Sequence, residues 1–181
     1  KLTFSGRLGW INHKFDSPPM FGDLGGNPVS EASGKQGIGT GNTVSITGSG
    51  SYLATPTFII DMYTGGTIIK TSSLPYRTGE NLGTDFLGLR GTNGGGELYS
   101  GWPQFGFTGN TFSPLGNAGS AGTPFVDDNW QYQWTTNATW TRGRHVIKFG
   151  GDIVRQALNR FETGSPSGTF NFVGGTTTIR G

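Results

Sequence analysis

The strongest constraint on the fold is a strict alternation of apolar and polar side chains over residues 129–142. The even positions carry four aromatic rings with Thr136 and Ala138 between them, and the odd positions carry amides and hydroxyls: Trp130, Tyr132, Trp134, Thr136, Ala138 and Trp140 against Asn129, Gln131, Gln133, Thr135, Asn137, Thr139 and Thr141. A period of two is the pattern of a β-strand with two different environments, because an α-helix would spread these rings around its circumference. The segment is therefore expected to be a strand with one apolar and one polar face.

The apolar face of this strand is unusually rich in tryptophan. Each indole N–H needs a hydrogen-bond partner, so three tryptophans on one face fit poorly into a tight soluble core. At a lipid boundary the same rings contact water or headgroups, and aromatic girdles on the outer face are expected of membrane barrels. This composition favours a membrane strand.

The same alternation predicts further strands along the chain. Strands are expected near residues 1–11, 44–53, 57–64, 129–141 and 145–157, with a short one near 168–173. The connections between them alternate, since 12–43 and 65–128 are long, whereas 54–56 and the turn around Gly143 are short. Long surface loops alternating with short periplasmic turns are typical of an outer-membrane barrel.

The predicted fold is all-β, an antiparallel up-and-down transmembrane β-barrel segment with long extracellular loops. Each strand is long enough for the roughly 9–11 residues that a tilted membrane strand needs. Five strands cannot close, because the smallest common barrels have about 8. The chain also starts at Lys1 without an initiator methionine or a visible signal peptide. We therefore expect an incomplete barrel that is part of a longer protein, with residues 1–181 forming one partial barrel domain.

Composition excludes several other classes. Aromatic residues make up 13% of the chain, which argues against disorder, and charged residues also make up 13%, about half the usual share. The net charge of +2 predicts no nucleic-acid partner. The absence of cysteine excludes disulfides and cysteine-ligated metals, and no apolar run reaches the roughly 18 residues of a transmembrane helix.

No motif predicts an enzyme, a cofactor or a metal site. His13 and His145 are expected at exposed strand edges, because two lone histidines form no known ligand spacing. Asp127 and Asp128 are interpreted as a solvated loop end in preference to a cation site. The glycine runs 37–41 and 94–96 are predicted to be flexible loop, because no Gly-Lys-Ser/Thr follows either run. No local cluster of serine, histidine and acid suggests nucleophilic catalysis.

Four aromatic residues in the second long connection are the candidate ligand contacts. They are Tyr99, Trp102, Phe105 and Phe107, which lie among glycines. Loops on a rigid scaffold often carry function, so these rings are candidates for gripping a ligand. Equally, they can pack the loop onto itself, and the sequence leaves both interpretations open.

The predicted hairpin resembles the barrel of Oar-like TonB-dependent receptors. The resemblance rests on WTTNATWTRGRHVIKFGGD at 134–152, RQ at 155–156, NRFETG at 159–164 and GTFNF at 168–172. Upstream, Pro56-Thr57-Phe58 with Asp61 looks like a strand of that family entered from a short periplasmic turn. The match is specific from about 127 to 172. No plug domain, TonB box or N-terminal carboxypeptidase-regulatory-like module is recognisable in the chain.

The resemblance implies a barrel of about 22 strands with a plugged lumen, energised through TonB from the inner membrane. It implies outer-membrane lipid, a TonB-type energy-coupling protein acting on a plug region, and an unknown transported substrate as partners. The expected function is gated substrate binding and translocation across the outer membrane. The alternatives are a passive porin and a secreted β-rich binding module, such as an adhesin or lectin-like sandwich.

Overall fold

The computed structural model describes residues 1–26, 37–107, 112–117, 124–164 and 166–173 of the chain. Its elements, in order, are β1 (Leu2–Ser17), η1 (Gly22–Leu24), β2 (Gly37–Thr55), β3 (Phe58–Leu74), η3 (Leu82–Phe86), η4 (Glu97–Tyr99), β4 (Gln104–Phe107), β5 (Leu115–Gly116), β6 (Phe125–Arg142), β7 (His145–Glu162) and β8 (Thr169–Phe172). The chain divides into two compact units. The strand unit is Lys1–His13, Gly41–Lys70 and Asp127–Arg160, and the loop unit is Lys14–Thr40, Thr71–Val126 and Phe161–Gly181.

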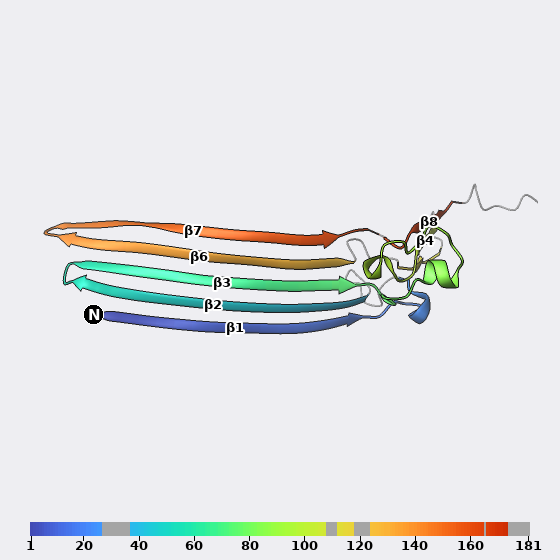
Figure 1. The fold of residues 1–181 in the computed structure, drawn as a ribbon, viewed down its shortest axis with the longest axis horizontal. Helices are drawn as coiled ribbons and strands as arrows, with labels where there is room; N and C mark the ends of the chain where they lie inside the picture. The colour runs from blue at the N-terminus through green and yellow to red at the C-terminus, as the bar shows by residue number, and fades with distance from the viewer. Residues whose placement is uncertain (27–36, 108–111, 118–123, 165, 174–181) are drawn as a thin grey trace, which may run out of the picture. The chain divides into compact units, whose positions relative to one another are not determined.

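The strand unit is built on a five-stranded sheet in the order β1-β2-β3-β6-β7. Neighbouring arrows point in opposite directions, so the sheet is antiparallel (Figure 1). Strands that follow each other in sequence lie next to each other, with β4 and β5 skipped between β3 and β6. This is an up-and-down arrangement, and it confirms the all-β antiparallel prediction. The sheet is open, with β1 and β7 as its edges.

The five long strands cover the predicted ranges, apart from the end residues Lys1 and Thr57, and extend beyond them. They have 16, 19, 17, 18 and 18 residues. The predicted connections 12–43 and 65–128 were therefore too long, because their outer parts belong to strands. Alternation marks only the stretch where one face is apolar, whereas backbone pairing continues where both faces are polar. The short connections have two residues each, Pro56-Thr57 and Gly143-Arg144.

The turn between β6 and β7 explains the glycine at its first position. Gly143 has a φ of 62°, a conformation that is strained for residues with a side chain. A type II′ hairpin turn requires a positive φ at the first of its two turn residues, and glycine usually occupies this position. The twist of this turn matches that of the flanking strands. The tight turn therefore fixes the register of the β6–β7 hairpin.

The glycine run 37–41 lies in β2, so the prediction of a flexible loop there was wrong. Two of its glycines lie beneath aromatic rings of β1. A Cβ at Gly39 would lie 1.8 Å from Cε1 of Phe15, and one at Gly41 would lie 2.0 Å from Cε1 of His13. The rings take the place of the missing side chains, as in the aromatic cover of glycines known for β-sheets.

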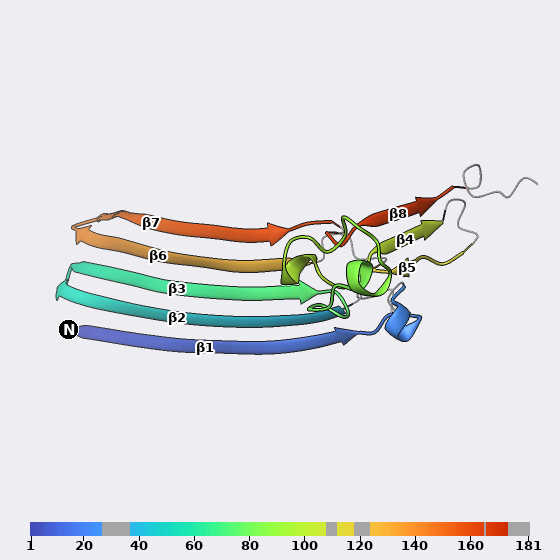
Figure 2. The same ribbon diagram turned by 45° about the vertical axis from the view of Figure 1, so that its right-hand side comes forward.

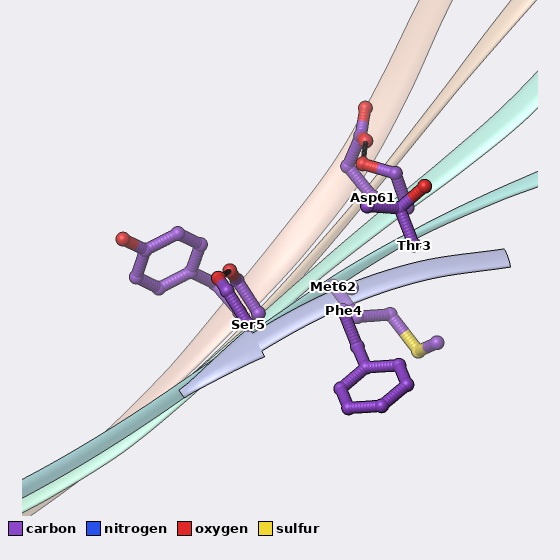
Figure 3. Close-up of a pocket in the computed structure, with 9 residues that line it drawn as sticks. Thr3, Phe4, Ser5, Asp61 and Met62 are labelled. Atoms are coloured by element: carbon purple, nitrogen blue, oxygen red, sulfur yellow. Dashed lines mark hydrogen bonds between the residues drawn. The ribbon is translucent and has the colours of Figure 1, made fainter. Parts of the chain in front are cut away.

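Almost no apolar side chain is buried in the described residues. Only Leu82 and Ala138 are buried hydrophobics there, whereas Phe4 is 81% exposed, Phe149 56% and Trp134 52%. Figure 3 shows Phe4 and Met62 pointing to one side of the strands and Thr3 and Asp61 pointing to the other. The sheet is thus a single layer with two exposed faces and no hydrophobic core of its own.

The loop unit contains a small sheet in the order β5-β4-β8. β4 pairs antiparallel with β5 and parallel with β8 (Figure 2). In the parallel pairing, Phe105 lies opposite Phe170 and Phe107 lies opposite Phe172. Its fully buried side chains are small or cyclic: Pro103, Pro124, Ser73, Ser100 and Ser167. Within the described ranges, no helix is long and apolar enough to cross a membrane.

Candidate functional site: two faces of a sheet and an ordered loop unit

The polar face of the strand unit is rich in hydroxyl groups and is cross-linked by hydrogen bonds between strands. Ser5 Oγ and Ser49 Oγ are 2.7 Å apart, which joins β1 to β2. Ser51 Oγ donates to Asp61 Oδ1 at 2.5 Å, which joins β2 to β3. These contacts between directly opposed strands keep the polar side chains on one face, as the period of two requires.

Charged groups on the same polar face surround a hollow of about 520 Å³ on β3, β6 and β7. Asp61, Lys148 and Asp152 line it together with the side chains of Thr135, Asn137 and Thr139. Gly150 leaves space there, since a Cβ would lie 2.4 Å from Oδ1 of Asn137. Charged side chains on both sides of an open groove fit a wet lumen better than a packed core.

A second hollow, of about 430 Å³, lies along the edge strand β1 (Figure 3). Its lining includes Ser5 from the polar face and Phe4 from the apolar face. A hollow lined from both faces is open around the strand edge, so it is not an enclosed ligand pocket.

The apolar face carries an arginine above a tryptophan towards each end of the β6–β7 hairpin. The guanidinium carbon of Arg142 lies 5.5 Å from the ring centroid of Trp140, and that of Arg155 lies 5.6 Å from the ring centroid of Trp130. Trp130 also stacks on Tyr132 with centroids 5.8 Å apart and planes 8° apart. Arginine over tryptophan is the favourable cation–π geometry.

The distance between Trp130 and Trp140 matches the distance between the two interfaces of an outer membrane. Trp130 and Trp140 lie ten residues apart on one strand, which at ~3.3 Å per residue is ~33 Å along β6. A strand tilt of ~40° reduces this length to ~25 Å along the membrane normal, which is the height of the apolar band expected of an outer-membrane barrel. Trp134 lies between them, near the middle of the band.

The four predicted loop aromatics all lie in the loop unit, and each is half-buried against other residues of that unit. Tyr99 contacts Phe161 edge to face, with centroids 6.3 Å apart, and Trp102 contacts Phe86 at 5.7 Å. Phe105 and Phe107 belong to a row of stacked rings: Phe105, Phe107, Phe170 and Phe172, with Phe112 edge to face on Phe107. Phe112 is 68% exposed. Contact of these rings with a ligand remains a prediction.

Asn93 organises the loop that precedes Trp102. Its φ is 55°, a conformation that asparagine tolerates better than most residues. Its Oδ1 accepts from the backbone of Gly83 at 2.8 Å, and its Nδ2 donates to the carbonyls of Tyr99 at 2.9 Å and Gly101 at 3.0 Å. One buried side chain thus satisfies backbone groups from both ends of the loop.

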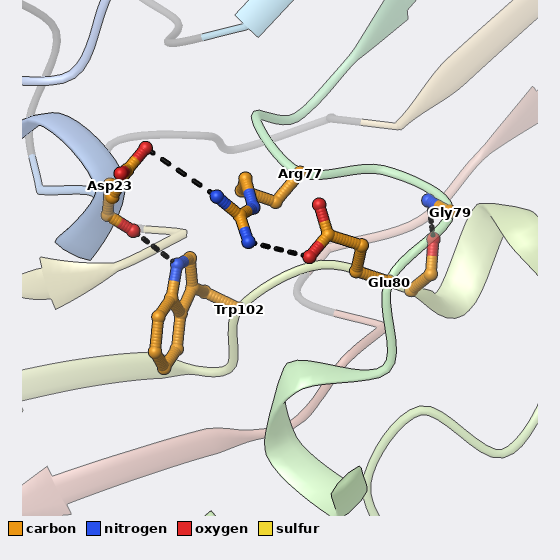
Figure 4. A network of polar contacts seen from close by, with 6 residues as sticks. Asp23, Arg77, Gly79, Glu80 and Trp102 are labelled. Carbon is orange, nitrogen blue, oxygen red and sulfur yellow. Dashed lines mark hydrogen bonds and ion pairs between the residues drawn. The ribbon is translucent and has the colours of Figure 1, made fainter. Parts of the chain in front are cut away.

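Arg77 joins two connections that are distant in sequence. Its Nη2 lies 2.6 Å from Glu80 Oε2 and its Nη1 lies 3.5 Å from Asp23 Oδ1 (Figure 4). The hydrogen bond to Glu80 raises the pKa of Arg77 above its ordinary value, so the guanidinium stays charged. Trp102 Nε1 donates to the carbonyl of Asp23 at 2.6 Å, which places this ring beside the same acid. Arg77 also has a positive φ of 62°.

The sequence interpretation of the two adjacent aspartates was wrong. Asp127 and Asp128 lie inside β6, not at a loop end, and each faces a cation of a neighbouring strand. Asp128 Oδ2 lies 3.2 Å from Lys70 Nζ, and Asp127 Oδ1 lies 3.7 Å from Arg160 Nε. His13 lies in β1, whereas His145 opens β7. In the described part of the chain, no group of three or more histidine, cysteine or acidic side chains is arranged to hold a metal ion.

The sequence did not single out Asp23, Arg77 or Asn93. Arginine at a positive φ has no local signature, and the partners of Arg77 come from different connections. The parallel pairing of β4 with β8 was also not foreseen, although a short strand near 168–173 was expected. The one usable signal was the repeated Phe-x-Phe spacing at 105–107 and 170–172, which puts both rings of each strand on one face.

Comparison with known proteins agrees with this geometry. A family model described as an outer membrane beta barrel domain matches residues 1–181. Neither the curated proteins nor the solved structures that were compared give a match. Since the family match covers all of the strands and loops described above, the chain belongs to the outer membrane beta barrel domain family and is a protein of the outer membrane.

Proposed function

We propose that the chain belongs to a TonB-dependent outer-membrane transporter that binds a substrate and passes it through a gated barrel. The observation that carries the proposal is the resemblance of residues 127–172 to the Oar-like receptors, which covers the β6–β7 hairpin and β8. The described part of the loop unit is a second support. Asn93 and the Arg77 network hold its connections in defined positions, and loops positioned in this way suit the capture of a substrate.

The proposal includes further strands beside the five described here. In lipid, an unpaired backbone N–H or C=O costs several kcal/mol, so an open sheet edge is not stable there. β1 and β7 are such edges. We infer that additional strands pair with them, and that the polar face of the strand unit then lines the lumen.

A passive porin is the second candidate. The hydroxyl-rich polar face, with Ser5, Ser49 and Ser51 beside Asp61, is also suited to a water-filled channel. Membership of the outer-membrane family is compatible with both functions. A secreted adhesin or lectin-like module has less support, because the exposed apolar face would then face water.

Permeability of vesicles to sugars of increasing size separates the two candidates. The protein is folded into lipid vesicles with all strands of its barrel, and vesicle swelling in arabinose, sucrose and raffinose is recorded. A gated transporter with an occupied lumen is expected to give no swelling above that of empty vesicles. Swelling that is fast for the smallest sugar and decreases with sugar size would overturn the transporter proposal and favour the porin.

Cells provide the complementary measurement for the transporter. Uptake that this protein supports is expected to disappear when the TonB-type coupling protein is removed or the inner membrane is de-energised with a protonophore. Uptake that continues unchanged in both conditions would contradict coupled transport.

A further inference from the structure

Arg155 is a cation on the apolar face of the strand unit. It shares its parity on β7 with Ile147, Phe149 and Ile153, all of which are exposed on that face. Within the described ranges Arg155 forms no ion pair. Its only partner there is the ring of Trp130, 5.6 Å from the guanidinium carbon. A lipid-facing arginine is tolerated when its long stem lets the charged head reach the interface.

The interface lies close to Arg155. Lys70 and Asp128 pair at 3.2 Å on the same face. Lys70 lies two positions after Ile68 on β3, and Asp128 lies two positions before Trp130 on β6. Apolar side chains therefore give way to charged ones at the same level on both strands. The long connections leave the sheet at this end of the strands, which makes it the extracellular boundary in a barrel of this type.

We propose that Arg155, assisted by Lys70, binds the phosphate of a phosphorylated glycolipid of the outer leaflet, a lipopolysaccharide. The planar guanidinium offers a fork of donors that matches phosphate oxygens, and the Trp130 ring beneath it holds the plane in place. Lys70 keeps a 62% exposed side chain even while it pairs with Asp128, so its ammonium remains accessible to a second anion.

The surface selects a lipid over a soluble anion. Two positions further into the apolar band lie Tyr132, next to Trp130 on β6, and Ile153, next to Arg155 on β7, and Trp134 follows on β6. These side chains are 43%, 67% and 52% exposed. A lipid that carries its phosphate immediately above its acyl chains complements both parts at once. A free phosphate ion would contact only the cations and would gain nothing from the apolar surface below them.

The test is a titration of the protein, folded in phosphatidylcholine vesicles, with lipid A in two forms. One form carries its phosphates, and the other has the same acyl chains with the phosphates removed. Arg155→Gln is expected to weaken binding of the phosphorylated form by about tenfold, the effect of losing one charge-assisted group, and to leave binding of the dephosphorylated form unchanged. Inorganic phosphate at millimolar concentration is expected not to compete.

Arg142→Gln is the matched control, because Arg142 lies over Trp140 in the same geometry at the other end of the hairpin. It is expected to leave binding of lipid A unchanged. The proposal is overturned if both lipid forms bind equally, if the Arg142 variant shows the same loss, or if inorganic phosphate displaces the lipid. If Arg155→Gln fails to fold, Arg155→Lys is used instead, because lysine keeps the positive charge but lacks the planar pair of donors. Its affinity for phosphorylated lipid A is expected to fall by about threefold. An unchanged affinity in the Arg155→Lys variant also overturns the proposal.

Discussion

Tyr76 has a strongly raised pKa and lies outside the membrane-spanning part of the strands. Tyr76 Oη donates to Asp16 Oδ1 at 2.5 Å, which links the second residue after β3 to the end of β1. The hydrogen bond to Asp16 raises the pKa of Tyr76 to about 12, with desolvation and the negative charge of Asp16 adding to it. The contact is therefore made by neutral tyrosine and would be broken by tyrosinate.

The pH dependence of this contact follows from the direction of the shift. The ordinary tyrosine pKa is 10.0, so the unfolded chain loses this proton first. The stabilisation is complete below pH 10 and is lost as the pH rises through about 12. A spectrophotometric titration should show one late-ionising tyrosine that Tyr76→Phe removes and Asp16→Asn shifts to lower pH. A Tyr76→Phe variant with the same late step would contradict this assignment.

The structural roles of the glycines at 37–41 and of Asn93 could not be predicted from the sequence. The run 37–41 looked like flexible loop because glycine is common there, but Gly39 and Gly41 are covered by the rings of Phe15 and His13. Which side chain covers a glycine depends on the register between strands, and no local pattern contains that information. Asn93 was missed for the same reason, since its partners are found only after the loop has folded.

At the scale of elements, the two faces of β6 have opposite requirements. Trp134 lies near the middle of the apolar band and is 52% exposed, whereas Gln133 is its neighbour on the polar face. Because successive side chains of a strand point to opposite faces, Gln133 and Trp134 are expected to face water and lipid respectively. Substitutions at these two positions therefore test the assignment of the faces. The strand itself was predictable, because alternation of fourteen residues is a local property of the chain.

An arginine at each of these two positions should have very different effects. Trp134→Arg is expected to destabilise the folded protein by about 2–4 kcal/mol, as for arginine near the bilayer midplane, and Gln133→Arg should change stability by less than about 1 kcal/mol. Denaturant unfolding of the protein in vesicles measures both. Equal losses, or a larger loss for Gln133→Arg, would mean that the assignment of the two faces is wrong.

At the scale of the whole molecule, the decisive property is the near absence of buried apolar side chains. Soluble domains of this length bury most of the surface of the unfolded chain around a core. Here the large apolar side chains of the strand unit are exposed or half-buried, and Ala138 is its one buried hydrophobic among the described residues. Exposed apolar surface of this extent marks an interaction with membrane or protein.

The protein should therefore require detergent or lipid to fold. Near-ultraviolet circular dichroism and size-exclusion chromatography in plain buffer are expected to show an aggregated or unfolded chain, and addition of detergent micelles should produce a monodisperse species with fixed tertiary signals. A folded, monodisperse preparation in buffer alone would contradict the lipid-facing assignment of the apolar face.

The sequence by itself determined the fold class, the positions of the five long strands and the two environments of each strand. These follow from alternation and turn residues, which act between near neighbours in the chain. Only the tertiary structure decided the full strand lengths, the parallel pairing of β4 with β8, the partners of Arg77 and the placement of Arg155 over Trp130. These features join segments far apart in sequence, and their energies depend on a register that local patterns do not encode.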